Sequence, residues 1–219
     1  MDDGTLLIDK PAGMSSFGVV ARIRRVISER AGKKIKVGHT GTLDPFATGL
    51  MILVLGKECK NAGSYSKLDK VYETTIRIGQ TSSTGDPEGD IIDVSSRQPD
   101  RDEIEHVLGN FVGEISQKPP IFSAIKINGQ RAYKLARGGQ EVEIPSRQVQ
   151  IHELDLIDYA YPNLTIRTHV SSGTYIRSLA VDIGEALGTG AYCTQLRRTR
   201  VANWSVEAAK TLAEFGIVD

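Results

Sequence analysis

A glycine-rich segment followed by an apolar run constrains this chain most. Residues 38–50 read GHTGTLDPFATGL and hold three glycines, one histidine and one aspartate. Glycine permits backbone angles that other residues avoid, so the chain can turn sharply here and a ligand can approach it closely. The nearly all-apolar stretch at 47–56 indicates a helical turn that runs into a buried strand. We therefore expect a tight loop that presents Asp44 as the group that carries chemistry.

Asp44 also has a purely structural interpretation. An aspartate followed by proline is typical of a helix start, with Asp44 as the N-cap and Pro45 at the first helical position. Taken alone, this interpretation is the commoner one, and His39 taken alone fits a loop or packing residue. The choice depends on the rest of the chain.

Composition and charge limit the class of protein. The 219 residues suffice for one large domain or two small ones. No apolar run is long enough to span a bilayer, and the N-terminus is unlike a signal or transit peptide. The two cysteines form no CxxC pair, so we expect reduced thiols in a cytoplasmic protein.

The distribution of charged residues along the chain is more informative than the net charge. The net charge is zero, which by itself argues mildly against a nucleic-acid partner. Residues 1–40 hold eight basic and four acidic side chains, and residues 117–150 hold six and two, whereas residues 81–115 hold two and nine. Such separation is compatible with a basic face on a neutral molecule.

Hydrophobic periodicity predicts an α+β fold with a mixed or antiparallel sheet. The expected strands are 4–9, 70–79, 149–161 and 164–171, and the expected helices are 17–30, 101–111, 176–187 and 208–215. In the first helix the apolar face is formed by Phe17, Val20, Ile23 and Ile27. Hairpins and helices follow one another without regular βαβ alternation, which favours the α+β class.

Several common sites are excluded by motif. No GxGxxG follows a strand, no GxxxxGK[ST] is present, and no GxSxG nucleophile elbow occurs. The histidines are scattered in sequence, and none has a partner at zinc-ligand spacing: His39, His106, His152 and His169. We therefore expect neither a bound dinucleotide nor a metal.

Nine short motifs occur along residues 5–205 in a characteristic order. They are IDKP (8–11), GMSS (13–16), HTGTLDP (39–45), KVY (70–72), GQT (79–81), QKPP (117–120), SAIK (123–126), GTYIRSL (173–179) and LRRTR (196–200). In this order they resemble the bacterial tRNA pseudouridine-55 synthase (TruB) family. Two positions depart from the family's usual pattern, since Phe122 stands where it often has Tyr and Val170 where it often has Cys.

The resemblance implies one catalytic domain over residues 1–219 with the pseudouridine synthase fold. This fold has a central mixed, mainly antiparallel sheet flanked by helices and RNA-contacting loops. Many relatives also carry a separate C-terminal RNA-binding (PUA) domain, which we do not expect within residues 1–219. The resemblance further implies no cofactor and no metal, tRNA as partner through its T-arm stem-loop, no membrane, no obligate protein partner and a monomer.

The implied reaction isomerises uridine at position 55 in the T loop of tRNA. The N1–C1′ glycosidic bond breaks and the base rejoins the sugar through C5. The chemistry needs one ionised carboxylate near the sugar, as nucleophile or as base, and Asp44 matches it. Arg177 matches the family's arginine that pairs with this aspartate, and arginine stays charged at any relevant pH. Tyr72 matches the aromatic residue that stacks on the flipped base and helps to remove the C5 proton.

The resemblance also implies a set of RNA contacts. His39 inserts into the RNA loop, while Tyr175 and Leu196 line the pocket. The basic residues of the set are expected to bind RNA: Lys10, Lys126 and Arg197, together with the Lys- and Arg-rich 117–147 segment.

Two other function classes remain as alternatives. A non-catalytic tRNA-binding or tRNA-folding module would need the basic face but not Asp44. A glycoside-cleaving enzyme for free small molecules would normally need a second acidic residue near Asp44, and no motif supplies one.

Overall fold

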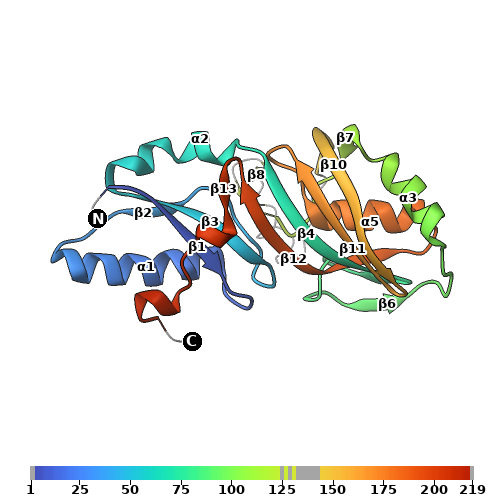
Figure 1. Cartoon of the computed structure of the whole chain (residues 1–219), viewed down its shortest axis with the longest axis horizontal. Helices are drawn as coiled ribbons and strands as arrows, with labels where there is room; N and C mark the ends of the chain where they lie inside the picture. Colours follow the sequence, from blue (N-terminus) through green and yellow to red (C-terminus); the bar gives the residue numbers. More distant parts are fainter. Residues whose placement is uncertain (1–2, 124–125, 128–129, 132–143, 218–219) are drawn as a thin grey trace. The chain divides into compact units, whose positions relative to one another are not determined.

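The structure, a computed structural model, describes residues 3–123, 126–127, 130–131 and 144–217 (Figure 1). Contacts between Cα atoms divide the chain into two compact units. Unit 1 comprises Met1–Glu73 and Leu196–Asp219, and unit 2 comprises Thr74–Gln195. Strands β4 (Lys70–Ile78) and β12 (Ala191–Val201) contribute residues to both units.

Unit 1 is built around β3 (Thr48–Leu55), whose residues are buried from Gly49 onward. One edge of β3 pairs antiparallel with β1 (Gly4–Lys10). The other edge pairs antiparallel with β2 (Val37–His39) opposite residues 53–55 and parallel with β12 opposite residues 48–49. The short strand β13 (Trp204–Ser205) returns along β12. The parallel β3–β12 pair makes the sheet of this unit mixed.

Helix α1 (Ser16–Ala31) of unit 1 has clear end signals. The hydroxyl of Ser15 accepts a hydrogen bond from the Gly18 amide at 3.0 Å, and Gly32 ends the helix in the left-handed conformation at φ 62°. Val20 and Ile23 are buried as expected, but Phe17 is 68% exposed. Phe17 was therefore wrongly assigned to the core, because the buried face of the helix runs through Ser16, Val19, Val20 and Ile23 instead.

The remaining elements of unit 1 are short. A 3₁₀ turn, η1 (Gly56–Asn61), leads into α2 (Ala62–Ser66). The segment 208–215 was expected to form a helix. It instead contains the last residue of one 3₁₀ turn, η2 (Val206–Ala208), and a second 3₁₀ turn, η3 (Ala213–Phe215). That prediction was wrong. The apolar side chains of this segment lie on isolated 3₁₀ turns and not on one face of a continuous helix.

Unit 2 contains strands in the order β12–β4–β11–β10–β7. The long strand β10 (Arg147–Ala160) pairs antiparallel with β11 (Asn163–Val170) through a tight turn and with β7 (Gly113–Gln117) on its other edge. Two small hairpins accompany the sheet, β5 (Gln80–Ser82) with β6 (Ile91–Asp93) and β8 (Lys126–Ile127) with β9 (Gln130–Arg131). The expected pairing of 149–161 with 164–171 is confirmed.

Two helices pack against this sheet. Helix α3 (Arg101–Gly109) contacts β10 and α5 (Ile176–Ala186), and its N-cap Asp100 accepts from the Glu103 amide at 2.9 Å. Helix α5 approaches β12 closely at Gly184, where an added Cβ would lie 2.4 Å from the Cβ of Ala191. Glycine is required there because any side chain would push the helix off the strand.

The α+β class with a mixed sheet is confirmed. Two local expectations were wrong: no helical turn precedes β3, and the polar 79–89 loop contains β5. In the part of the chain that the structure describes, no helix is both long and apolar enough to cross a membrane.

Candidate active site

Asp44 lies on the connection between β2 and β3 in unit 1. Its residue is partly buried, and the chain around it forms bends rather than a helix. The structural interpretation of Asp44 as a helix N-cap was therefore wrong. Thr40 fixes the start of the connection, because its amide and its hydroxyl both donate to the Ile52 carbonyl, at 3.1 and 3.2 Å.

Backbone groups on both sides of Asp44 are bonded to side chains from distant parts of the sequence. Before it, the hydroxyl of Ser16 accepts from the Leu43 amide and donates to the Leu43 carbonyl, each at 2.8 Å. After it, the carbonyl of Pro45 accepts from the ammonium of Lys10 at 3.0 Å. The loop is thus anchored on either side of the carboxylate, which is how a protein keeps a reactive group in place without reorganisation.

Arg198 explains two of the three glycines in this segment. Its side chain is 2% exposed and donates to the carbonyls of Gly41 at 3.1 Å and Leu50 at 2.7 Å. A Cβ at Gly41 would lie 3.4 Å from the guanidinium. A Cβ at Gly49, where φ is +105°, would lie 2.3 Å from the Arg198 carbonyl oxygen. The glycines let β12 and its arginine approach the loop and β3 directly.

Lys70 is a second buried cation near Gly41. Its ammonium donates to the carbonyls of Ser66, at 3.1 Å, and Leu68, at the end of α2. Burial and the positive charge of Arg198 lower the pKa of Lys70 to about 8, and Asp69 opposes this in part. Unit 1 therefore places two cationic side chains beneath the loop that carries Asp44.

Arg177, in unit 2, is 3% exposed at the start of α5. Its guanidinium donates to the Asp86 carboxylate at 2.9 Å and to the carbonyls of Thr84 at 2.9 Å and Phe122 at 2.8 Å. Asp86 is fixed in turn by the Thr84 hydroxyl at 2.6 Å and the Glu88 amide at 3.0 Å. The positive charge of Arg177 is therefore buried and hydrogen-bonded in one orientation.

Tyr175 precedes α5 and is held through its backbone. The buried amide of Gln117 accepts from the Tyr175 N–H at 2.8 Å and donates to the Tyr175 carbonyl at 3.1 Å. The guanidinium carbon of Arg147 lies 4.8 Å from the centre of the Tyr175 ring, a cation–π contact. At Gly173, where φ is +89°, an added Cβ would lie 3.4 Å from the same guanidinium. The backbone angle and the close approach account for the glycine in GTYIRSL.

The other sequence-predicted residues are distributed over both units. In unit 1, Tyr72 on β4 and Leu196 on β12 are buried, at 7% and 8% exposure, and His39 is half-buried at the end of β2. Arg197 on β12 is 40% exposed and pairs with Asp9 at 2.7 Å. In unit 2, Lys126 lies on β8. Most of the expected basic 117–147 segment, residues 124–125, 128–129 and 132–143, lies outside the described residues.

Lys10, on β1 of unit 1, is buried. It is 0% exposed, and its ammonium donates to the carbonyls of Pro11 at 2.8 Å and Pro45 at 3.0 Å. These contacts help to position the Asp44 loop. An RNA contact of Lys10 stays a prediction of the family resemblance.

The four histidines are scattered in the sequence, but two of them lie close together in the structure. His152 on β10 and His169 on β11 lie side by side in unit 2, with ring centroids 4.7 Å apart. Sequence spacing missed this pair because antiparallel strands bring together residues that are distant in sequence.

Four polar residues hold the candidate site in place but had no predicted role: Ser16, Asp86, Gln117 and Arg198. All but Asp86 lie inside one of the nine motifs. A polar residue in an otherwise apolar segment could have indicated these positions, because a buried polar side chain needs a hydrogen-bond partner.

Comparisons with known proteins agree with these observations. The N-terminal domain model of TruB family pseudouridylate synthases matches residues 24–176, and the tRNA pseudouridylate synthase B C-terminal domain model matches residues 177–216. A tRNA pseudouridine synthase B of Burkholderia mallei is 46% identical over 210 residues, which cover 96% of this chain and 68% of that protein. One from Cupriavidus taiwanensis is 45% identical over 219 residues, covering 99% and 68%.

Solved structures show the same architecture. The chain matches a Cbf5–Nop10–Gar1 complex with a TM-score of 0.74, 29% identity and 96% coverage, and an archaeal box H/ACA Nop10–Cbf5 complex with 0.71, 26% and 97%. It spans about half, 52%, of each of those solved chains. The class that fold and sequence define is that of the pseudouridylate synthases, which are isomerases. Within this class, the chain belongs to the TruB family.

Proposed function

We propose that this chain converts uridine to pseudouridine at position 55 in the T loop of tRNA, with Asp44 as its catalytic carboxylate. The observation that carries the proposal is the loop of Asp44, whose flanking residues Leu43 and Pro45 are each bonded to a buried side chain. Membership of the TruB family, and relatives named tRNA pseudouridine synthase B, support the reaction and the substrate.

The reaction conserves atoms. The N1–C1′ bond breaks, a C5–C1′ bond forms, C5 loses a proton and N1 gains one. Nothing is oxidised or reduced, so one carboxylate, a stacking surface and a proton acceptor suffice.

Asp44 can act in two ways. Its carboxylate adds to C1′ as a nucleophile, or it removes a proton from the sugar as a base. Substrate with deuterium at C2′ separates these routes, because only removal of that proton in a rate-determining step gives a primary isotope effect.

The target base must leave the stack of the T loop, at a cost of a few kcal/mol. We propose that Tyr72 supplies the face on which the uracil rests and that its hydroxyl assists loss of the C5 proton. The pairing of Arg177 with Asp44 stays a prediction of the family resemblance. The rigid hold of Asp86 on Arg177 supports a role for that fixed positive charge.

The T-arm stem-loop is the proposed binding partner. His39 is proposed to enter the RNA loop, Tyr175 and Leu196 to line the pocket, and Lys126 and Arg197 to contact the RNA. We propose further that the chain acts in the cytoplasm as a monomer without an obligate protein partner. Light scattering of the chain alone, and activity of the purified chain alone, test these last points.

The central test compares Asp44→Asn with wild type on a T-arm stem-loop in single-turnover conditions. We expect pseudouridine formation to be lost while RNA affinity stays within a few fold. Asp102→Asn, an exposed carboxylate on α3, is the matched control and should keep wild-type turnover. Retained turnover in Asp44→Asn would refute the assignment.

Two further arms distinguish the alternatives. Turnover of free uridine or UMP at rates comparable to the stem-loop would favour an enzyme for small molecules. RNA binding by wild type without any pseudouridine formation would favour a non-catalytic module.

A further inference from the structure

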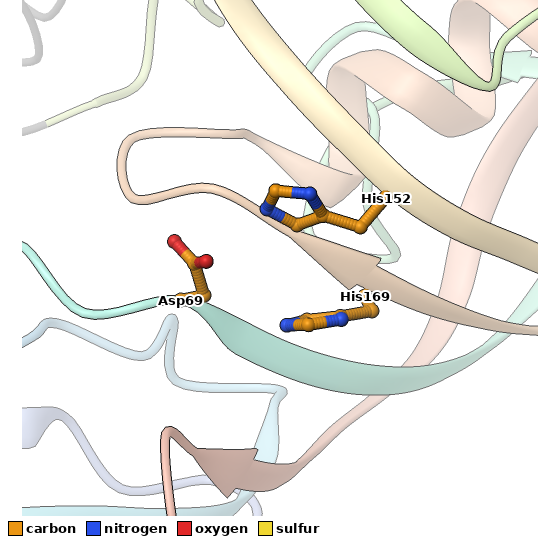
Figure 2. A group of neighbouring side chains, drawn as sticks. All are labelled: Asp69, His152 and His169. Carbon is orange, nitrogen blue, oxygen red and sulfur yellow. The ribbon is translucent and has the colours of Figure 1, made fainter.

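His152 and His169 form a close pair of imidazoles in unit 2 that the proposed reaction does not use. Figure 2 shows His152 projecting from β10 and His169 from the neighbouring strand β11, with the two rings next to each other; Asp69, also drawn, belongs to unit 1. Both strands are part of one antiparallel hairpin, so their relative position is set by the β10–β11 ladder.

A β-bulge lies at this histidine pair. Along the ladder Ile151 is opposite Val170, and Glu153 is opposite His169, so His152 is an additional residue on β10. Bulges re-aim side chains and are typical of places where a sheet carries a function. His152 and Glu153 of β10 therefore share His169 of β11 as their cross-strand neighbour.

The distances suit a shared metal ion. The ring centroids are 4.7 Å apart with the planes at 45°, and a nitrogen of one ring lies within 4.8 Å of a nitrogen of the other. Two imidazoles on one tetrahedral Zn²⁺, each bonded at about 2.0–2.1 Å, place their nitrogens about 3.3 Å apart. His152 is exposed and His169 half-buried, so a small ring rotation closes the difference and leaves room for water as further ligands.

We propose that His152 and His169 form a chelating site for a divalent transition-metal ion of the Zn²⁺ and Cu²⁺ class. Neutral imidazole is a preferred ligand for these ions, whereas Mg²⁺ and Ca²⁺ require oxygen ligands. Two imidazoles alone impose little selectivity among these ions, so affinity should follow the intrinsic order, with Cu²⁺ bound more tightly than Zn²⁺. The bound ion would tie the bulged part of β10 to the end of β11, just before the turn that leads to Tyr175 and α5.

Calorimetric titration of the intact chain with ZnCl₂, and separately with CuCl₂ and MgCl₂, tests the site. We expect one Zn²⁺ per chain, tighter binding of Cu²⁺, and no binding of Mg²⁺. His152→Ala and His169→Ala should each weaken Zn²⁺ binding at least tenfold. A Cys59→Ser background removes the partly exposed thiol as a competing ligand.

His106→Ala is the matched control, because His106 is an exposed histidine on α3 outside this pair. It should bind Zn²⁺ like wild type. Circular dichroism of each variant checks that the hairpin still folds, and ¹H–¹⁵N spectra of the imidazole rings report binding at His152 and His169 directly. Equal affinity in both alanine variants and wild type, or ring signals that do not respond to Zn²⁺, would overturn the proposal.

Discussion

The guanidinium of Arg177 and the carboxylate of Asp86 form an ion pair at 2.9 Å in which both side chains are almost completely buried, at 4% and 6% exposure. Such a pair is favourable only if its remaining hydrogen-bonding groups are also satisfied, and here Thr84, Glu88 and Phe122 supply partners. The β5–β6 region therefore fixes the first turn of α5.

Asp86→Asn should destabilise the chain strongly. Asp86→Asn removes the carboxylate of a buried ion pair with Arg177, and breaking such a pair from one side costs about 3–5 kcal/mol. Urea unfolding followed by circular dichroism measures the loss. Glu105→Gln breaks the exposed Arg101–Glu105 pair, whose side chains are 53% and 50% exposed, and should change stability by no more than about 1 kcal/mol. Equal effects of the two substitutions would contradict the account of the Arg177–Asp86 pair.

Gly49→Ala should disrupt the contact between β3 and β12. The added Cβ would lie 2.3 Å from the backbone oxygen of Arg198, and φ is +105° at this position. Steric overlap and backbone strain together should lower the free energy of unfolding by more than about 3 kcal/mol. Gly63→Ala is the control, because a Cβ there meets nothing within 4 Å. Comparable thermal midpoints for both variants would show that the strands can separate at Gly49 at little cost.

The amino-acid sequence predicted the parts of the fold whose signals are local. Hydrophobic periodicity predicted the helix over 17–30 and the strands 149–161 and 164–171, which correspond to α1, β10 and β11. Strand β12 was not predicted, because LRRTR reads as a charged surface cluster. In the structure Arg198 turns inward and is buried by hydrogen bonds to Gly41 and Leu50, which lie more than a hundred residues away.

In the candidate site, too, local motifs were recognised from the sequence, whereas contacts between distant residues were not. HTGTLDP and GTYIRSL identified Asp44 and Arg177 by resemblance. The side chains that hold these segments could not be assigned from spacing, because each contact joins distant parts of the sequence. Lys10 is an example: its ammonium donates to the carbonyl of Pro45, 35 residues further along the chain.

Asp182 on α5 should make the chain more stable at mildly acidic pH than at neutral pH. Burial, and secondarily the charge of Glu185, raises the pKa of Asp182 from 3.8 to about 6. The folded state therefore binds this proton more tightly than the unfolded state, and stability falls as pH rises from about 4 to 6. Asp182→Asn should be neutral at pH 4 and stabilising by on the order of 1–2 kcal/mol at pH 7.

Denaturant midpoints of Asp182→Asn and wild type at pH 4 and 7 measure this effect. Glu185→Gln removes the second cause and should move the transition to lower pH without abolishing it. A constant difference between Asp182→Asn and wild type at both pH values would show that the Asp182 carboxyl does not titrate in this window.

For Lys70, in unit 1, we expect the opposite dependence of the unfolding free energy on pH. Burial, then the charge of Arg198, lowers the pKa of Lys70 from 10.5 to about 8. Between these values the unfolded chain holds a proton that the folded chain has released, so this group makes stability rise as pH rises from about 8 to 10.5. Lys70→Met and Lys70→Arg both remove the rise, because neither side chain titrates there.

Unfolding free energies at pH 7.5 and 10 test this prediction. Lys70→Met loses hydrogen bonds to the carbonyls of Ser66 and Leu68 and should be less stable than wild type at both pH values. The informative quantity is the change of that difference with pH. It should grow by on the order of 2 kcal/mol in favour of wild type between pH 7.5 and 10. A difference that stays constant would mean that the Lys70 ammonium keeps its proton beneath Gly41 in spite of burial and the neighbouring guanidinium.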